Sequence, residues 1–308
     1  MPSEECSFKD KVINDFKSVK LIWIVIISIF FMLSNLLRAL RWNQFLDTMN
    51  YKPSVTNSLG AIMVAYLANL AIPRIGEVIR AGTLAKNEKI PVEKVMGTIV
   101  LDRLLDVISL LICIGLAFIF AFQTFKDYNE EHGMMNAQLL YILIGIGVAG
   151  LIGLLLLNKF LSQSTSQNPI VKKLQSLWIG FRDGLISVKN VKNFPLLIFY
   201  SVGIWVCYYL MTYLCFFAFA PTSHLGPIAG FVAFVFGSLG IVFPAPGGIG
   251  SYQYLVSQAL ILYGVNIFDA FSFSNIVFIS INIIGNILFG FFFFFYLPIY
   301  NRKRLQQS

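Results

Sequence analysis

Long uncharged apolar runs are the feature that most constrains the fold of this chain. Together they hold a single charged residue, Asp106, and they cover residues 21–37, 104–122, 139–157, 196–220 and 276–297. A helix of about 20 apolar residues spans the hydrocarbon core of a bilayer, whereas a membrane β-barrel shows alternating segments of about 10 residues. The sequence therefore predicts an all-α, polytopic integral membrane bundle of about seven or eight membrane helices, with at least one broken or re-entrant hairpin.

The composition leaves no room for a soluble domain. Only 12% of the residues are charged, against roughly 25% in soluble globular domains. We therefore expect one transmembrane domain over residues 20–297, after a polar segment at 1–19 and before a basic tail at 298–308. The net charge of +8 favours contact with anionic lipid headgroups over nucleic acid. The spacing of the cysteines predicts no metal site, and no motif predicts a cofactor.

The placement of lysine and arginine predicts a multi-pass orientation in the cell membrane. Residues 158–194 carry basic side chains against a single acid, Asp183, and the basic tail is similar, so both are expected in the cytoplasm. The loop around Glu130 and the uncharged turn at 221–226 are expected outside. Apolar side chains recur at helical spacing in residues 168–190, which predicts an amphipathic helix in the inner interface.

The side of the N-terminus depends on how the chain runs after the first helix. Lysines before residue 21 favour an inside N-terminus, which requires residues 54–72 to cross the membrane fully. In the alternative, residues 54–85 form a re-entrant hairpin, the N-terminus lies outside, and the two halves of the chain are inverted repeats. Charge counting favours the inside N-terminus.

Charged residues within apolar segments are the first candidates for function, because charges in lipid are expensive and usually face a partner or a cavity. Asp102 and Asp106 share one helix face, since they are four residues apart. The residues expected to meet at similar depth are Arg74, Glu77, Arg80, Asp102, Arg103 and Asp106. We favour a polar cavity that receives a lipid headgroup, and the alternative is a buried ion-pair network that fixes packing.

Two more arginines, Arg38 and Arg41, share a face at the end of the first helix. They could extend to the interface beside Trp42, or they could bind phosphate, whose oxygens match the guanidinium fork. No acid lies near them in sequence.

Residues 243–253 cannot form a regular helix, because they read Phe-Pro-Ala-Pro-Gly-Gly-Ile-Gly-Ser-Tyr-Gln. We expect this broken motif to lie at membrane depth and to line a cavity, with the next helix starting near Ser251 and offering its N–H groups to an anion. The alternative is a simple loop at the membrane edge. The candidate residues of the motif are Pro244, Pro246, Gly247, Gly248, Gly250 and Gln253.

These motifs, in this order, resemble the transmembrane flippase-like domain of the lysylphosphatidylglycerol synthase family. The matching residues are Arg41 and Trp42, Asn69, Pro73 to Glu77, Arg80, Gly97 and Thr98, Arg103, Asp106, and Pro244 to Gly250. The resemblance covers nearly the whole chain. It implies a membrane domain that moves a lipid between leaflets.

Two departures limit what the resemblance implies. The full-length synthases carry a cytoplasmic aminoacyltransferase domain, which this sequence lacks, so their synthase activity is not expected here. The family commonly has an acid three residues after the last glycine of the broken motif, where this chain has Gln253.

We therefore expect a membrane protein, and not an enzyme, that binds and translocates a phospholipid or another anionic lipid. One alternative is a membrane-embedded enzyme acting on a lipid phosphate or a polyprenyl-linked sugar, for which Asp102 and Asp106 are the candidate metal-binding pair. The other is a scaffold subunit for a separate lipid-modifying enzyme. The expected partners are membrane lipids, anionic phospholipids first.

Overall fold

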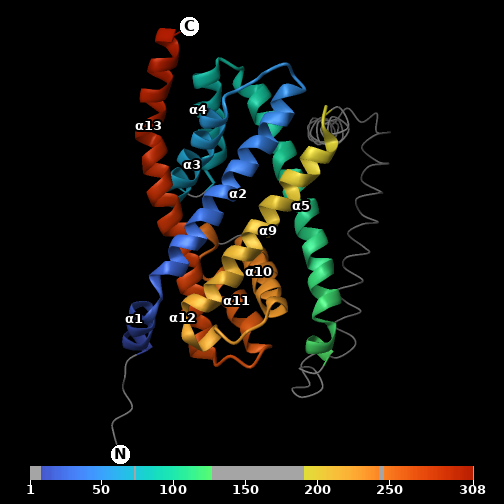
Figure 1. Ribbon diagram of the computed structural model, residues 1–308, viewed down its shortest axis with the longest axis vertical. Coiled ribbons are helices and arrows are strands. Elements are labelled where there is room, and N and C mark those ends of the chain that lie inside the picture. The colour runs from blue at the N-terminus through green and yellow to red at the C-terminus, as the bar shows by residue number, and fades with distance from the viewer. Residues whose placement is uncertain (1–7, 73, 127–190, 243–245, 308) are drawn as a thin grey trace, which may run out of the picture. The chain divides into compact units, whose positions relative to one another are not determined.

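A computed structural model describes residues 8–72, 74–126, 191–242 and 246–307 (Figure 1). The chain divides into two compact units, Met1–Phe122 with Lys192–Ser308, and Gln123–Val191. The second unit lies almost wholly outside the described residues, and with it the expected span at 139–157, the loop around Glu130 and the amphipathic helix at 168–190. All that follows concerns the first unit.

Four helices of the described residues are long and apolar enough to cross a membrane. These are α2 (Leu21–Asp47), α5 (Val92–Phe120), α9 (Phe194–Cys215) with its short extension, and the continuous rod of α12 (Ile267–Phe278), η5 (Ile279–Gly285) and α13 (Asn286–Gln307). They coincide with the longest apolar runs, because a helix is the structure that satisfies every backbone hydrogen bond within one segment. The expected polytopic helical membrane protein is confirmed.

The shorter helices α3 (Val55–Ala71) and α4 (Gly76–Glu88) form a hairpin. Its two open ends are tied together, because the Glu88 carboxylate accepts hydrogen bonds from the Ser54 N–H (2.8 Å) and from the Asn57 amide (2.6 Å). At the closed end, Asn69 accepts a hydrogen bond of 2.7 Å from the Gly76 N–H. Residues 55–88 therefore form a helical hairpin, which is the local structure that the alternative interpretation of this stretch predicts.

A second hairpin joins α10 (Pro227–Val242) to α11 (Ser251–Ile261). The two helices pack closely at Gly240, where a Cβ atom would lie 2.6 Å from the Tyr252 Cα. The Ser251 hydroxyl donates a hydrogen bond of 2.6 Å to the Gly240 carbonyl and closes the turn. A glycine is therefore required where the arms of this hairpin converge.

The two hairpins point in opposite directions between long helices (Figure 1). The order long helix, hairpin, long helix occurs twice, first as α2, α3–α4, α5 and then as α9, α10–α11, α12–α13. The Lys20 N–H donates to the Ala218 carbonyl (3.0 Å), so α2 starts where α9 ends. The end of α13 lies instead at the open end of the first hairpin, where Arg304 contacts Glu88 at 2.7 Å. This is the inverted-repeat plan that was the sequence alternative.

The termini of this unit consequently lie at opposite ends of the bundle. At the N-terminal end, Lys11 in α1 (Phe8–Ser18) pairs with Asp269 at 2.7 Å, close to the turn at 221–226. At the other end lie the start of α3, the end of α4 and the basic tail.

We expect single cysteines at Asn14 and Arg302 to label from opposite sides in a variant that lacks the native cysteines. Both positions are exposed, one in α1 and one in the tail. An impermeant thiol reagent applied to whole cells should label Asn14→Cys and should reach Arg302→Cys only after lysis. Labelling of both cysteines from the same side would contradict the hairpin of α3 and α4.

Glu88 is the centre of the contacts at the tail end of the bundle. Burial alone would raise its pKa, but hydrogen bonds from Arg304, Asn57 and Ser54 outweigh burial and leave the pKa below its ordinary value of 4.5. Because the folded-state pKa is lowered, the stabilisation is present above about pH 4.5 and is lost as the pH falls through the folded-state value.

Replacing Glu88 with glutamine should therefore lower the melting temperature in detergent at pH 7, at a cost of about 1–2 kcal/mol. The difference from the wild type should shrink as the pH falls from 4.5 through the lower folded-state pKa, because the wild-type carboxylate becomes neutral over this range. Glu93→Gln, at an exposed position on the next helix, is the matched control. A deficit that stays constant from pH 7 to acid would argue against an ionised Glu88 as the source.

Candidate functional site

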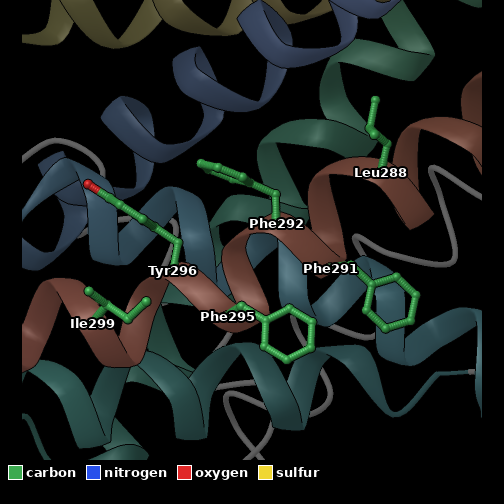
Figure 2. Close-up of a pocket in the computed structure, with 6 residues that line it drawn as sticks. All are labelled: Leu288, Phe291, Phe292, Phe295, Tyr296 and Ile299. Carbon is green, nitrogen blue, oxygen red and sulfur yellow. The ribbon is translucent and has the colours of Figure 1, made fainter.

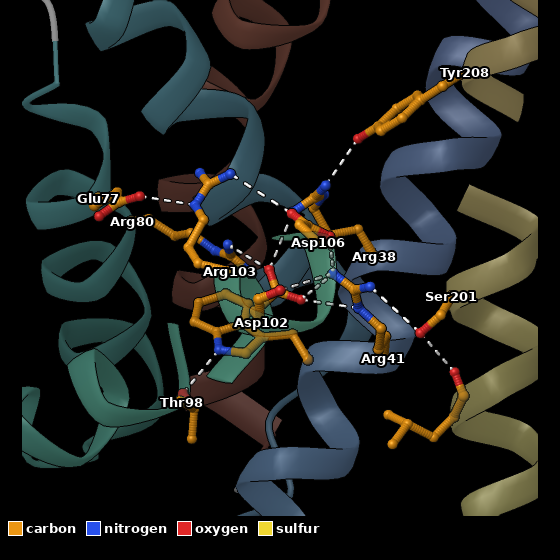
Figure 3. A network of polar contacts seen from close by, with 12 residues as sticks. Arg38, Arg41, Glu77, Arg80, Thr98, Asp102, Arg103, Asp106, Ser201 and Tyr208 are labelled. Carbon is orange, nitrogen blue, oxygen red and sulfur yellow. Dashed lines mark hydrogen bonds and ion pairs between the residues drawn. The ribbon is translucent and has the colours of Figure 1, made fainter. Parts of the chain in front are cut away.

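Three helices bring seven charged side chains into one cluster (Figure 3). Within α2 and α4 the two contributions lie three residues apart, and in α5 Asp102 and Asp106 lie four apart, so each of these pairs shares one helix face. The members of the charged cluster are Arg38 and Arg41 from α2, Glu77 and Arg80 from α4, and Asp102, Arg103 and Asp106 from α5.

Asp102 is the buried centre of this cluster, and its side chain is fully buried. One carboxylate oxygen accepts hydrogen bonds from Arg41 Nε (3.0 Å) and Nη2 (2.6 Å). The other accepts from Arg38 (3.2 Å) and Arg80 (3.0 Å). Three guanidinium groups from two helices thus converge on a single carboxylate of a third.

Asp106 lies one helical turn further along and bridges the same two arginines of α2. Its oxygens accept from Arg38 (2.8 Å) and Arg41 (2.7 Å), and Arg103 lies 3.7 Å away. Its side chain is 16% exposed, unlike that of Asp102. Asp106 therefore stands between the buried centre and the rim.

The rim of the cluster is an ion pair between Arg103 and Glu77 at 2.8 Å. Their side chains are 43% and 46% exposed, so this pair is the open side of the cluster.

The charged cluster has one more cation than it has anions, because four arginines face three carboxylates. Some of its donors are also unused. Among the side chains that the structure describes, Arg80 Nε and Nη2 and Arg38 Nε are buried without a hydrogen-bond partner. Buried donors without partners are costly, and an anion with several acceptor oxygens would satisfy both the charge and the donors.

Neutral side chains hold the arginines in place. The Arg80 guanidinium lies 3.9 Å from the centre of the Trp42 ring, and the Trp42 N–H donates to Thr98 at 2.9 Å. On α9, Tyr208 accepts a hydrogen bond from Arg38 (2.9 Å) and Ser201 accepts one from Arg41 (3.4 Å). The second repeat therefore contributes uncharged acceptors to a charge cluster of the first.

The structure corrects the expected membership of the cluster at three positions. Arg74 lies in the exposed turn between α3 and α4 and takes no part in the contacts described above. Arg38 and Arg41 belong to the cluster, although no acid lies near them in sequence, because α2 packs against α5. The sequence analysis did not identify Tyr208 or Ser201, which are ordinary residues of an apolar helix, and it named Thr98 only as part of the family resemblance.

The broken motif is described from Pro246 onward, so Pro244 lies outside the described residues. Positive φ values at Gly247 (62°), Gly248 (76°) and Gly250 (88°) explain why this turn needs glycine. The buried Gln253 side chain accepts a hydrogen bond of 2.7 Å from the Gly250 N–H and so caps α11. The amide thus performs locally the capping that a carboxylate would perform, without the charge.

An apolar groove of about 440 Å³ lies on the outer face of α13 (Figure 2). It is lined by Leu288, Phe291, Phe292, Phe295, Tyr296 and Ile299. The Tyr296 hydroxyl is its one polar side-chain group, so the groove offers no charge to a headgroup. Its chemistry is that of a surface facing lipid chains.

Asp102→Asn should destabilise the protein strongly, because it leaves three buried guanidiniums with a neutral amide, at a cost of roughly 3–5 kcal/mol. Thermal unfolding in detergent measures the loss. Lys192→Gln is the control, since it removes an exposed ion pair with Asp47 (2.9 Å) and should cost at most about 1 kcal/mol. Similar melting temperatures for the two variants would show that Asp102 does not hold the helices together.

Comparison with known proteins gives two matches. Residues 9–298 match the family model described as the lysylphosphatidylglycerol synthase TM region. A UPF0104 membrane protein of Pyrococcus horikoshii is 23% identical over 273 residues, which cover 79% of this chain and 78% of that protein. No solved structure matches the chain.

Proposed function

The chain belongs to the lysylphosphatidylglycerol synthase TM region family, and from this we propose that it binds the phosphate of an anionic membrane lipid and carries that lipid between leaflets. The charged cluster supplies the binding site. The observation that carries the proposal is the excess of one arginine over the carboxylates, together with buried arginine N–H groups that lack a partner.

The ligand chemistry follows from the cost of charge in a membrane. A site with an excess positive charge in a low-dielectric surrounding is stabilised by a bound anion. Guanidinium groups match the oxygens of phosphate and bind them through paired hydrogen bonds. The exposed Arg103 and Glu77 provide the side from which a headgroup would enter.

Movement of the lipid is supported by the arrangement of the hairpins. Inverted repeats with broken hairpins are a transporter plan in which the substrate site lies between the repeats and access alternates. Here α2 and α4 of the first repeat and α9 of the second all contact the charged cluster. A relative movement of the two repeats would therefore change the surroundings of the cluster.

The two alternatives receive less support from the contacts. A metal-dependent membrane enzyme would need Asp102 and Asp106 as ligands, but both carboxylates are bound by arginines. Among the described residues, no group of His, Cys, Asp and Glu has the arrangement of a metal site. A scaffold for a separate lipid-modifying enzyme would not need a cluster with excess charge and unused donors.

Reconstitution into liposomes tests the proposal. The protein should speed the movement of a fluorescent phosphatidylglycerol from the inner to the outer leaflet, measured by chemical quenching of the outer leaflet. Arg103→Gln should slow this movement about tenfold, because it removes one charged phosphate contact of roughly 1.5 kcal/mol. The ion pair that it breaks is half exposed, so folding should be preserved.

Lys192→Gln again serves as the control and should move the lipid as the wild type does, since Lys192 pairs with Asp47 away from the cluster. A wild-type rate equal to that of protein-free liposomes, for phosphatidylglycerol and for other phospholipids, would refute lipid translocation.

A further inference from the structure

Asp106 occupies the place in the charged cluster where an incoming phosphate would be expected to bind. Its two oxygens are held separately, one by Arg38 at 2.8 Å and the other by Arg41 at 2.7 Å, with Arg103 at 3.7 Å. An oxyanion whose oxygens are divided among guanidinium groups is also the usual geometry of an arginine-bound phosphate. The Asp106 carboxylate therefore offers these arginines two negatively charged oxygens, as a phosphate would.

Asp102 and Asp106 share partners but differ in position. Asp102 is fully buried and also binds Arg80, so it cannot leave without exposing three guanidiniums. Asp106 is partly exposed and adjoins Arg103 at the open rim. A ligand that enters past Arg103 and Glu77 thus meets Asp106 before it meets Asp102.

The phosphate and the Asp106 carboxylate cannot both occupy the space between Arg38 and Arg41. A rotation about the side-chain bonds of Asp106, between the rotamers open to it in a helix, would free both guanidiniums without moving the backbone. Asp102 would still hold Arg38, Arg41 and Arg80 in position during this exchange.

We propose that Asp106 is a built-in competitor for the phosphate of the transported lipid, a step that rests on the proposed function. In the empty site it holds Arg38 and Arg41 in the geometry of the bound state. When a lipid phosphate binds, it displaces the carboxylate, and the return of the carboxylate helps to expel the phosphate. Competition weakens binding and speeds release, which a carrier needs because a tightly held lipid would not leave.

The test is the affinity for a water-soluble, short-chain phosphatidylglycerol, measured by calorimetry on the purified protein in detergent. Asp106→Asn keeps the shape of the side chain and removes its charge, so binding should become about tenfold tighter, as expected for the loss of one competing charged contact. Translocation of fluorescent phosphatidylglycerol by the same variant should become slower, because release is impaired.

Glu77→Gln is the matched control. It removes the same charge from the rim, but Glu77 pairs with Arg103 alone and not with Arg38 or Arg41. If Asp106 is a competitor, Asp106→Asn should tighten binding more than Glu77→Gln does. Equal gains in the two variants would mean that Asp106 competes no more than a carboxylate of the rim does, and would overturn the proposal.

The test can still be made if Asp106→Asn is less stable than the wild type, because a bound lipid stabilises the folded protein more when its affinity is higher. Short-chain phosphatidylglycerol should then raise the melting temperature of Asp106→Asn more than that of the wild type. A variant that stays unfolded with this lipid, or that gains less stability than the wild type, would overturn the proposal.

Two further ligands, diacylglycerol and inorganic phosphate, show which part of the lipid competes with Asp106. An uncharged short-chain diacylglycerol should not bind with higher affinity to Asp106→Asn, because it has no phosphate. If inorganic phosphate bound to Asp106→Asn more tightly than to the wild type while the lipid did not, the occupant would be free phosphate and the proposal for a lipid phosphate would be overturned. If neither the wild type nor any variant bound phosphatidylglycerol, the proposed function itself would fail, whereas wild-type binding without a gain in Asp106→Asn would refute only the competition.

Discussion

The convergence of three guanidinium groups on the buried Asp102 carboxylate is the interaction on which the first repeat depends. It joins α2, α4 and α5 at one point within the apolar bundle, where the cost of transferring a lone charge from water is severe. Because α4 is the returning arm of the hairpin that α3 begins, its position relies on Arg80 near the closed end of that hairpin and on Glu88 at its open end. The charged cluster around Asp102 also holds one more arginine than carboxylates, so it carries an excess positive charge.

The fold could be predicted from the sequence wherever the physics of the bilayer leaves a single solution. Uncharged runs must be helices in lipid, and each of the long helices α2, α5 and α9 covers most or all of one such run. The path of the chain over residues 54–88 was harder to predict, because a count of lysines carries no information about which residues hydrogen-bond to each other. The helix that begins after the Ser54 cap has 17 residues, which is the lower limit for a full crossing, so its length alone does not distinguish a crossing helix from the arm of a hairpin.

The charged cluster could be predicted only in part, because local spacing is readable from the sequence and pairing between distant helices is not. The spacing of Asp102 and Asp106 places both on one helix face from local geometry alone. In the structure, both carboxylates accept hydrogen bonds from Arg38 and Arg41. The pairing itself joins residues more than 60 positions apart and depends on how α2 crosses α5, which no local pattern encodes. Arg74 was misassigned because the turn after α3 ends one helix and begins another, so the helical spacing between Arg74 and Arg80 does not hold there.

The amide of Gln253 has a consequence for how the second hairpin responds to acid. In relatives of the kind expected from the sequence resemblance, a carboxylate at this position would lose much of its strength as an acceptor on protonation, and the cap of the following helix would loosen with it. An amide does not ionise, so the bond from the Gly250 N–H to Gln253 is the same in neutral and acidic surroundings. The cap that Gln253 gives to the start of α11 is thus independent of pH.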